Sequence, residues 1–167
     1  MLVLVTGGSG SGKSEFAENI AAGLGGSLTY IAAMKPIDDE TVKRIERHRK
    51  MRSGKGFSTV ECYTGIKNLD ISATALLECM SNLTANEMYL PEGAGENTVE
   101  EILSGINHLR AVCDNLVIVT NEIDSDGMDY NDETVSYMKN LGMINCKTAE
   151  FADEVYEVVC GVPVRIK

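Results

Sequence analysis

Tryptophan is absent from the 167 residues, and phenylalanine occurs only three times. Proteins that bind single-stranded nucleic acid stack bases on aromatic side chains and attract the backbone with positive charge. Here positive charge is also scarce, because 15 basic residues stand against 25 acidic ones and the formal net charge is -10. Such a chain repels nucleic acid and anionic membranes over most of its surface. Nucleic acid is therefore not expected as a partner.

Paired cysteines and long apolar runs are missing as well. The five cysteines form no CxxC pair and no zinc-binding spacing. An odd, scattered set is typical of reduced thiols in the cytosol. The first apolar run, Leu2 to Val5, is too short for the apolar part of a signal peptide, and no run approaches the length of a membrane span. We therefore expect a cytoplasmic protein with no membrane span.

Apolar residues are plentiful, at 44% of the chain, and the length is typical of one domain. We therefore expect a single domain over residues 1–167. Strands alternate with helices along the chain, which predicts an α/β fold with a mostly parallel central sheet flanked by helices. The predicted strands are 2–5, 28–33, 73–77, 116–120 and 155–160, and the predicted helices are 14–24, 38–51, 99–113 and 134–149.

The segment Gly7-Gly8-Ser9-Gly10-Ser11-Gly12-Lys13-Ser14 matches the pattern G-x-x-x-x-G-K-[ST] in full. It follows a predicted strand and opens a predicted helix, as the pattern requires. Glycines let backbone N–H groups converge on phosphate oxygens, and the helix adds the positive end of its dipole. Lys13 is expected to reach the β- and γ-phosphates and Ser14 to ligate magnesium. The chain is therefore predicted to be a three-layer P-loop NTPase of the RecA-like type.

Two carboxylates are candidates for a second magnesium ligand. Glu78 and Glu122 each follow a predicted buried strand, and ligands of open α/β sheets bind at the carboxyl ends of the strands. Glu78 is preferred, and a loop carboxylate facing water is the alternative for either residue. The acidic segment 124–129 lacks part of the ligand pattern of a calcium loop, so we interpret it as a solvated acidic turn.

Seven of the fifteen basic residues lie between Lys43 and Lys55. A solvated helix face and a site for a polyanionic small molecule are both consistent with this cluster. His48 lies inside it, and a neutral imidazole can attack phosphorus while neighbouring arginines hold the phosphates. From the residues alone, a surface histidine is the favoured interpretation. The other histidine, His108, lies in the middle of a predicted helix and is interpreted as structural.

Taken together, the sequence resembles the bifunctional adenosylcobinamide kinase / adenosylcobinamide-phosphate guanylyltransferase family of cobalamin biosynthesis. The resemblance covers nearly the whole chain. The P-loop alone is not family-specific, but an R-I-x-x-H-R element at this distance from it is. The matching segments are Leu4 to Ser14, Arg44-Ile45-Glu46-Arg47-His48-Arg49, Val119-Thr120-Asn121-Glu122 and Gly161 to Lys167.

The resemblance implies two activities with GTP, ATP and magnesium. One phosphorylates adenosylcobinamide, a corrinoid, and the other transfers GMP from GTP to the product through a GMP-histidine intermediate, which falls on His48. It also implies a homotrimer. The P-loop pattern places Gly7, Gly8, Ser9, Gly10, Ser11, Gly12, Lys13 and Ser14 around the nucleotide, and the resemblance adds Ala32, Ala33, Met34, Arg49, Lys50, Met51, Arg52, Glu61 and Glu78.

Several positions depart from the family pattern. Gly10 stands where the family usually has arginine, and no arginine occurs between Asp132 and Asn140. Ser53, Phe57 and Cys146 replace the family's Pro, Trp and Gln. Fewer basic groups predict a weaker kinase step. Two alternatives stay open: another P-loop small-molecule kinase, which forms no covalent nucleotidyl-enzyme, and a degenerate member that only binds nucleotide.

Overall fold

The computed structural model describes residues 1–123 and 129–167, and within these ranges seven strands form one sheet. The strand order is β3-β2-β4-β5-β1-β6-β7, and the pairs are parallel except for the antiparallel pair β6 and β7. The strands are β1 (Leu2–Thr6), β2 (Leu28–Ala32), β3 (Phe57–Glu61), β4 (Thr74–Glu78), β5 (Asn115–Val119), β6 (Glu154–Val159) and β7 (Val162–Arg165).

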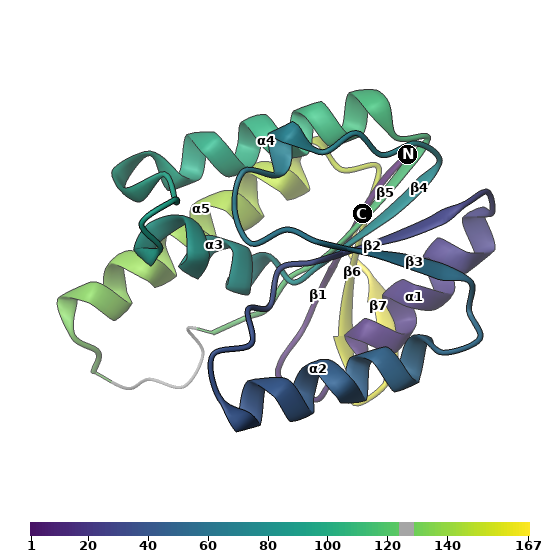
Figure 1. The fold of residues 1–167 in the computed structure, drawn as a ribbon, viewed down its shortest axis with the longest axis horizontal. Coiled ribbons are helices and arrows are strands. Elements are labelled where there is room, and N and C mark those ends of the chain that lie inside the picture. The colour runs from purple at the N-terminus through teal and green to yellow at the C-terminus, as the bar shows by residue number, and fades with distance from the viewer. Residues whose placement is uncertain (124–128) are drawn as a thin grey trace.

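Helices cover both faces of the sheet and make three layers (Figure 1). Helices α1 and α2 lie on one side, and α3, α4 and α5 lie on the other. The predicted α/β fold with a mostly parallel central sheet is therefore confirmed. The helices are α1 (Lys13–Leu24), α2 (Asp39–Arg52), α3 (Met80–Tyr89), α4 (Thr98–Val112) and α5 (Asp132–Phe151), with short 3-10 helices at Ile66–Asn68 and Gly95–Asn97.

The core has two halves because the central strands are buried on both faces. In β1, Leu2 and Leu4 pack into the cluster under α4 and α5, while Val3 and Val5 pack into the cluster under α1. Side chains of a strand alternate between faces, so one continuous apolar run supplies both halves. Each such side chain contributes roughly 1.5–3 kcal/mol by burial.

Besides the two short 3-10 helices, the structure contains three elements that the sequence did not predict, namely β3, β7 and α3. Both strands lie at the edges of the sheet, and every residue of β7 is exposed, so neither carries an apolar run. Helix α3 begins at Met80, two residues after β4 ends, which leaves no loop to mark its start. The acidic turn predicted at 124–129 lies, apart from Asp129, outside the described residues. In the described part of the chain, no helix has both the length and the apolar character of a membrane span.

Candidate active site

The P-loop lies between β1 and α1 and rests on the turn between β6 and β7. Gly7 has φ +146°, and a Cβ at this position would lie 2.5 Å from the carbonyl oxygen of Val158. Gly12 adopts a left-handed conformation at the start of α1, with φ 92°. The backbone N–H of Gly161 donates to the Ser11 carbonyl at 2.8 Å. The glycines therefore allow a tight loop that the β6–β7 turn supports from behind.

Lys13 begins α1 and folds back over the loop that precedes it. Its Nζ donates to the Gly8 carbonyl at 2.9 Å, and its side chain is largely buried. Burial lowers the pKa of Lys13, although the nearby Cys79 and Glu78 raise it in part, and Arg44 lowers it further. The ammonium group is therefore held against the loop that binds phosphate in P-loop proteins.

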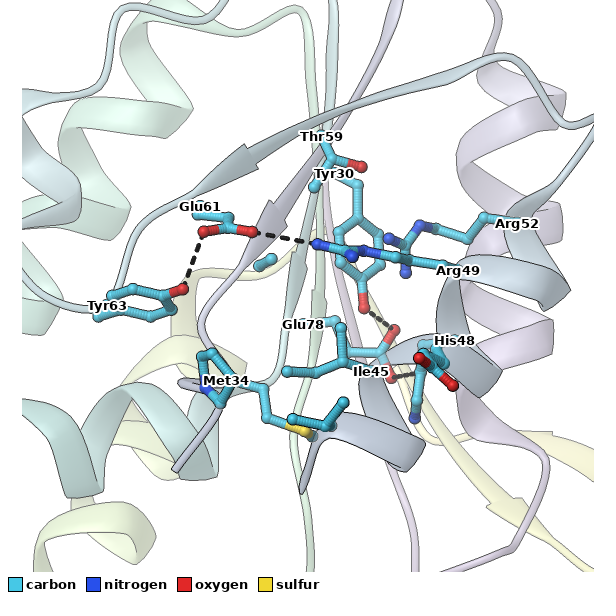
Figure 2. A pocket seen from close by; sticks show the side chains of 14 residues that line it. Tyr30, Met34, Ile45, His48, Arg49, Arg52, Thr59, Glu61, Tyr63 and Glu78 are labelled. Carbon is cyan, nitrogen blue, oxygen red and sulfur yellow. Dashed lines mark hydrogen bonds and ion pairs between the residues drawn. The ribbon is translucent and has the colours of Figure 1, made fainter. Parts of the chain in front are cut away.

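Glu78 ends β4, and side chains from three other elements converge on its carboxylate. Ser14 Oγ donates to Oε1 at 2.5 Å, and Tyr30 OH donates to Oε2 at 3.0 Å. His48 Nδ1 lies 3.2 Å from Oε1 (Figure 2). Burial of Glu78 works to raise its pKa, but the contacts with His48, Ser14 and Tyr30 outweigh it, so the pKa is lowered. The carboxylate is therefore held ionised between the P-loop and the histidine.

Tyr30 reaches this carboxylate from β2 and is covered by α2. Burial and the charge of Glu78 raise the pKa of Tyr30, while Arg52 lowers it in part, so the phenol stays a hydrogen-bond donor. The guanidinium carbon of Arg52 lies 3.5 Å from the centre of the Tyr30 ring. This stacking fixes one end of α2 over the sheet.

Glu122, the second carboxylate that the sequence offered, is exposed. Of the two candidates, Glu78 is the one that contacts Ser14, the other residue expected to ligate magnesium. His108 Nε2–H donates to the Leu69 carbonyl at 2.9 Å, in accord with its structural interpretation.

Two pockets meet at His48. We call the first the nucleoside pocket. It has a volume of about 150 Å³ and lies between α2, β2 and β3 (Figure 2). The second, the phosphate cleft, has a volume of about 420 Å³ and runs along the P-loop. Met34, His48 and Glu78 line both pockets. The imidazole therefore lies at the boundary between them.

Helix α2 divides its basic residues between these two pockets. Arg44 and Arg47 line the phosphate cleft, whereas Arg49 and Arg52 line the nucleoside pocket. Each pair is three residues apart, which places its members on one face of a helix. At the rim of the nucleoside pocket, Glu61 accepts from Arg49 Nη2 at 3.2 Å and from Tyr63 OH at 2.9 Å (Figure 2).

Most of the nucleotide-binding residues expected from the sequence lie at these pockets. Lys50 is exposed and lines neither of them. Ala33 is buried, and its carbonyl accepts from Asn86 Nδ2 at 2.8 Å, which gives it a structural contact. Gly7 and Gly8 also line neither pocket. The residues of the expected set that line the pockets are Ser9 to Ser14, Ala32, Met34, Arg49, Met51, Arg52, Glu61 and Glu78.

Sequence analysis did not select several residues that line these pockets. Tyr30 precedes Ala32 by two residues in β2, and Thr59 precedes Glu61 by two in β3. Side chains two residues apart in a strand share a face of the sheet. With β3 assigned, this spacing would have predicted Tyr30 and Thr59 as pocket residues. Asn82 and Asn121 line the phosphate cleft, but they come from α3 and the end of β5, which only the fold brings together.

This geometry defines the class of the protein. A parallel sheet with a P-loop between β1 and α1, and a carboxylate from β4 beside the P-loop serine, is a P-loop NTPase of the RecA-like type. Two solved structures share the fold. One is an ATPase domain with a TM-score of 0.51 and 12% identity, covering 93% of this chain and 68% of that chain. The other is a prototypical ATPase from the type III secretion system of pathogenic bacteria, with a TM-score of 0.52 and 10% identity, covering 98% and 56%.

Sequence comparison identifies the family within this class. A family model described as cobinamide kinase / cobinamide phosphate guanyltransferase matches residues 3–166, so the chain belongs to this family. The chain is 34% identical to the bifunctional adenosylcobalamin biosynthesis protein CobU of Salmonella typhimurium and 33% identical to that of Escherichia coli, with 100% of each chain covered. It is 26% identical to the bifunctional protein CobP of Pseudomonas aeruginosa, with 98% of this chain and 96% of that one covered. The predicted family is therefore confirmed.

Proposed function

We propose that the chain phosphorylates adenosylcobinamide with a nucleoside triphosphate and then transfers GMP from GTP to adenosylcobinamide phosphate. In the second reaction, His48 carries GMP from GTP to adenosylcobinamide phosphate. The observation that supports this most directly is the place of His48, beside Glu78 and at the boundary between the nucleoside pocket and the phosphate cleft. If a nucleotide occupies both pockets, its α-phosphate lies at their boundary, next to His48.

The nucleoside pocket is the proposed site of guanosine. A carboxylate accepts hydrogen bonds but does not donate them, and the edge of guanine presents two adjacent donors that adenine lacks. Glu61 supplies such a carboxylate at the rim of this pocket. Its ion pair with Arg49 is more than half exposed on both sides, so exchanging it for a base costs little.

Guanylyl transfer then follows from the orientation of His48. With its proton on Nδ1, facing Glu78, the imidazole keeps the lone pair of Nε2 for attack. Nε2 bonds to the α-phosphorus of GTP, the bond to the pyrophosphate breaks, and pyrophosphate leaves. A phosphate oxygen of adenosylcobinamide phosphate next attacks the same phosphorus, and the P–N bond breaks to restore His48. Arg44 and Arg47 supply positive charge along the cleft where pyrophosphate separates.

The kinase step uses the P-loop. Its backbone N–H groups and Lys13 hold the β- and γ-phosphates of ATP or GTP while the acceptor hydroxyl attacks the γ-phosphorus. Ser14 and Glu78 offer two oxygen ligands beside these phosphates, which fits magnesium. When bound, magnesium neutralises charge on the phosphate oxygens. No group of three or more His, Cys, Asp or Glu in the described ranges forms a metal site alone, so nucleotide and water would complete the shell.

The homotrimer implied by the resemblance and the cytoplasmic location expected from the sequence are also part of the proposal. The edge strand β7 offers apolar surface for an assembly, because Val162 and Val164 are exposed by 61% and 49%. An edge strand with exposed apolar residues is a favourable place for another chain to pair. Light scattering should then give a mass three times the 18.1 kDa of the chain.

Product analysis tests the two activities together. Wild type supplied with adenosylcobinamide, GTP and magnesium should yield adenosylcobinamide phosphate and then adenosylcobinamide-GDP. His48→Asn should stop at the phosphate, because Asn keeps a polar side chain but cannot carry GMP. Turnover of neither substrate by wild type would favour the degenerate member that only binds nucleotide. A phosphorylated product without any guanylylated one would favour another small-molecule kinase.

A further inference from the structure

A groove between α2 and α3 opens from the phosphate cleft. It has a volume of about 330 Å³. Met34, Glu40, Arg44 and Asn82 line both the groove and the phosphate cleft, so the two are continuous at this point. Of the residues that line the nucleoside pocket, only Met34 also lines the groove. A molecule in the groove would therefore reach the phosphates without competing for the space of the nucleoside.

The groove combines an apolar surface with polar groups at its junction with the cleft. Ile37 is exposed by 76% and Tyr89 by 47%, and both line the groove together with Ala85 and Leu90. Exposed apolar side chains gathered in one concave site are typical of a binding surface. At the junction, the half-buried Asn82 has no hydrogen-bond partner within the ranges that the structure describes, and Arg44 is exposed. These two side chains are available to a polar group that enters the cleft, and the exposed Glu40 lines the same junction.

We infer that the groove binds the acceptor, first as the alcohol and then as its phosphate monoester. The inference rests on the proposed function, in which the acceptor is a corrinoid. A corrinoid has a broad apolar ring with amides at its edge and carries its hydroxyl on a short flexible arm. The ring contacts Ile37, Ala85 and Tyr89, and the arm passes Asn82 and Arg44 into the phosphate cleft. After phosphorylation, Arg44 pairs with the new phosphate.

The groove and the nucleotide site can be tested separately, because labelling of His48 with GMP needs GTP but no acceptor. Two groove variants are informative. Ile37→Ser removes an exposed apolar contact at little risk to the fold, and Ala85→Glu places a charge in the groove. Ile166→Ser is the matched control, since Ile166 is exposed by 61% and lies outside the groove. Calorimetric titration with adenosylcobinamide and labelling with α-phosphate-labelled GTP are measured on each protein.

The groove variants should bind adenosylcobinamide more weakly, by roughly fivefold for Ile37→Ser and by at least about tenfold for Ala85→Glu. Their labelling by GTP, and both properties of Ile166→Ser, should match wild type. Unchanged corrinoid affinity in both groove variants would overturn the inference while leaving the proposed function standing. A fall in molar mass by light scattering without a change in corrinoid affinity would make the groove an interface between copies and would also overturn it. Wild type that binds no corrinoid would refute the proposed function itself.

Discussion

At the scale of single residues, the chemistry depends on which partners each of the two carboxylate oxygens of Glu78 contacts. Oε1 contacts the P-loop serine and the candidate nucleophile, and Oε2 accepts from Tyr30. One buried carboxylate thereby positions groups that serve both proposed reactions. Its negative charge also offsets the many basic groups of α2 at the point where a nucleotide brings phosphates. A neutral side chain of the same shape would keep the packing and lose that charge.

We expect Glu78→Gln to slow the formation of GMP–His48 by about 10- to 100-fold, the range of a lost orienting or charge interaction. The amide fills the same space, but it has no negative charge to attract a proton on His48 Nδ1, which lies 3.2 Å from Oε1 in the native protein. Single-turnover labelling with GTP measures the rate. Glu122→Gln serves as the control, since Glu122 is exposed. Equal rates in wild type and Glu78→Gln would show that the charge of Glu78 does not contribute to the formation of GMP–His48.

Gly7 is the P-loop position where the structure leaves least room for a side chain. Gly7→Ala would bring a Cβ to 2.5 Å from the Val158 carbonyl oxygen at a φ of +146°. We expect it to lower the free energy of unfolding by about 1–3 kcal/mol, because either the loop or β6 must shift. Chemical denaturation measures this loss. The matched variant is Gly8→Ala, where a Cβ would have no atom within 4 Å and which should stay within about 0.5 kcal/mol of wild type.

At the scale of elements, α2 matters because its two basic faces serve different pockets. Arg44 and Arg47 face the phosphate cleft, and Arg49 and Arg52 face the nucleoside pocket. The sequence showed that basic residues cluster around His48. It did not show that the helix would lie with His48 over Glu78, because Glu78 ends β4, which lies much further along the chain.

This division predicts that Arg47→Ala weakens the binding of ATP and GTP alike, by about tenfold each, since it removes a charge from the phosphate cleft and none from the nucleoside pocket. Equilibrium binding of both nucleotides measures the effect. Lys43→Ala is the control, because Lys43 is exposed and lines neither pocket. A selective loss for GTP alone would contradict the division.

The elements also show how far the sequence could predict the fold. Strands β1, β4 and β5 are buried on both faces and stand out as apolar runs, and the P-loop marks the start of α1 without ambiguity. Strands β3 and β7 lie at the edges of the sheet and carry polar or exposed residues, so their positions depend on pairing with distant strands. The site divides in the same way. Lys13, Arg44, His48 and Glu78 were selected from the sequence, whereas Tyr30 and Asn82 become part of the site only through packing.

At the scale of the whole molecule, the first strand of the chain pairs with β6, from its C-terminal part. Asp153 Oδ2 accepts from the backbone N–H of Leu2 at 2.6 Å, where β1 and β6 begin side by side. This hydrogen bond is the largest cause of the lowered pKa of Asp153. Burial works to raise the pKa, and the positive charges of the N-terminus, Arg110 and Lys167 lower it further. We propose that residues 1–167 unfold as one domain, with this contact as part of the cooperative unit.

The lowered pKa of Asp153 fixes the direction of a pH effect. The ionised carboxylate stabilises the native state above its unfolded pKa of about 3.9, and this contribution is lost as pH falls through the lower folded value. Asp153→Asn should therefore be less stable than wild type near neutral pH, and the difference should shrink as the pH falls below about 4. Denaturation followed at several pH values measures it. A difference that stays constant with pH would contradict this assignment, and two separate unfolding transitions would contradict a single domain.

The central claim is that His48 becomes covalently attached to GMP at the boundary of the two pockets. The most direct measurement incubates the protein with magnesium and GTP labelled at the α-phosphate, without acceptor, and maps the label by peptide mass spectrometry. We predict an acid-labile GMP adduct on His48, absent from His48→Asn and absent when the label is on the γ-phosphate. GTP that binds with no covalent adduct, or an adduct on another residue, would contradict the account.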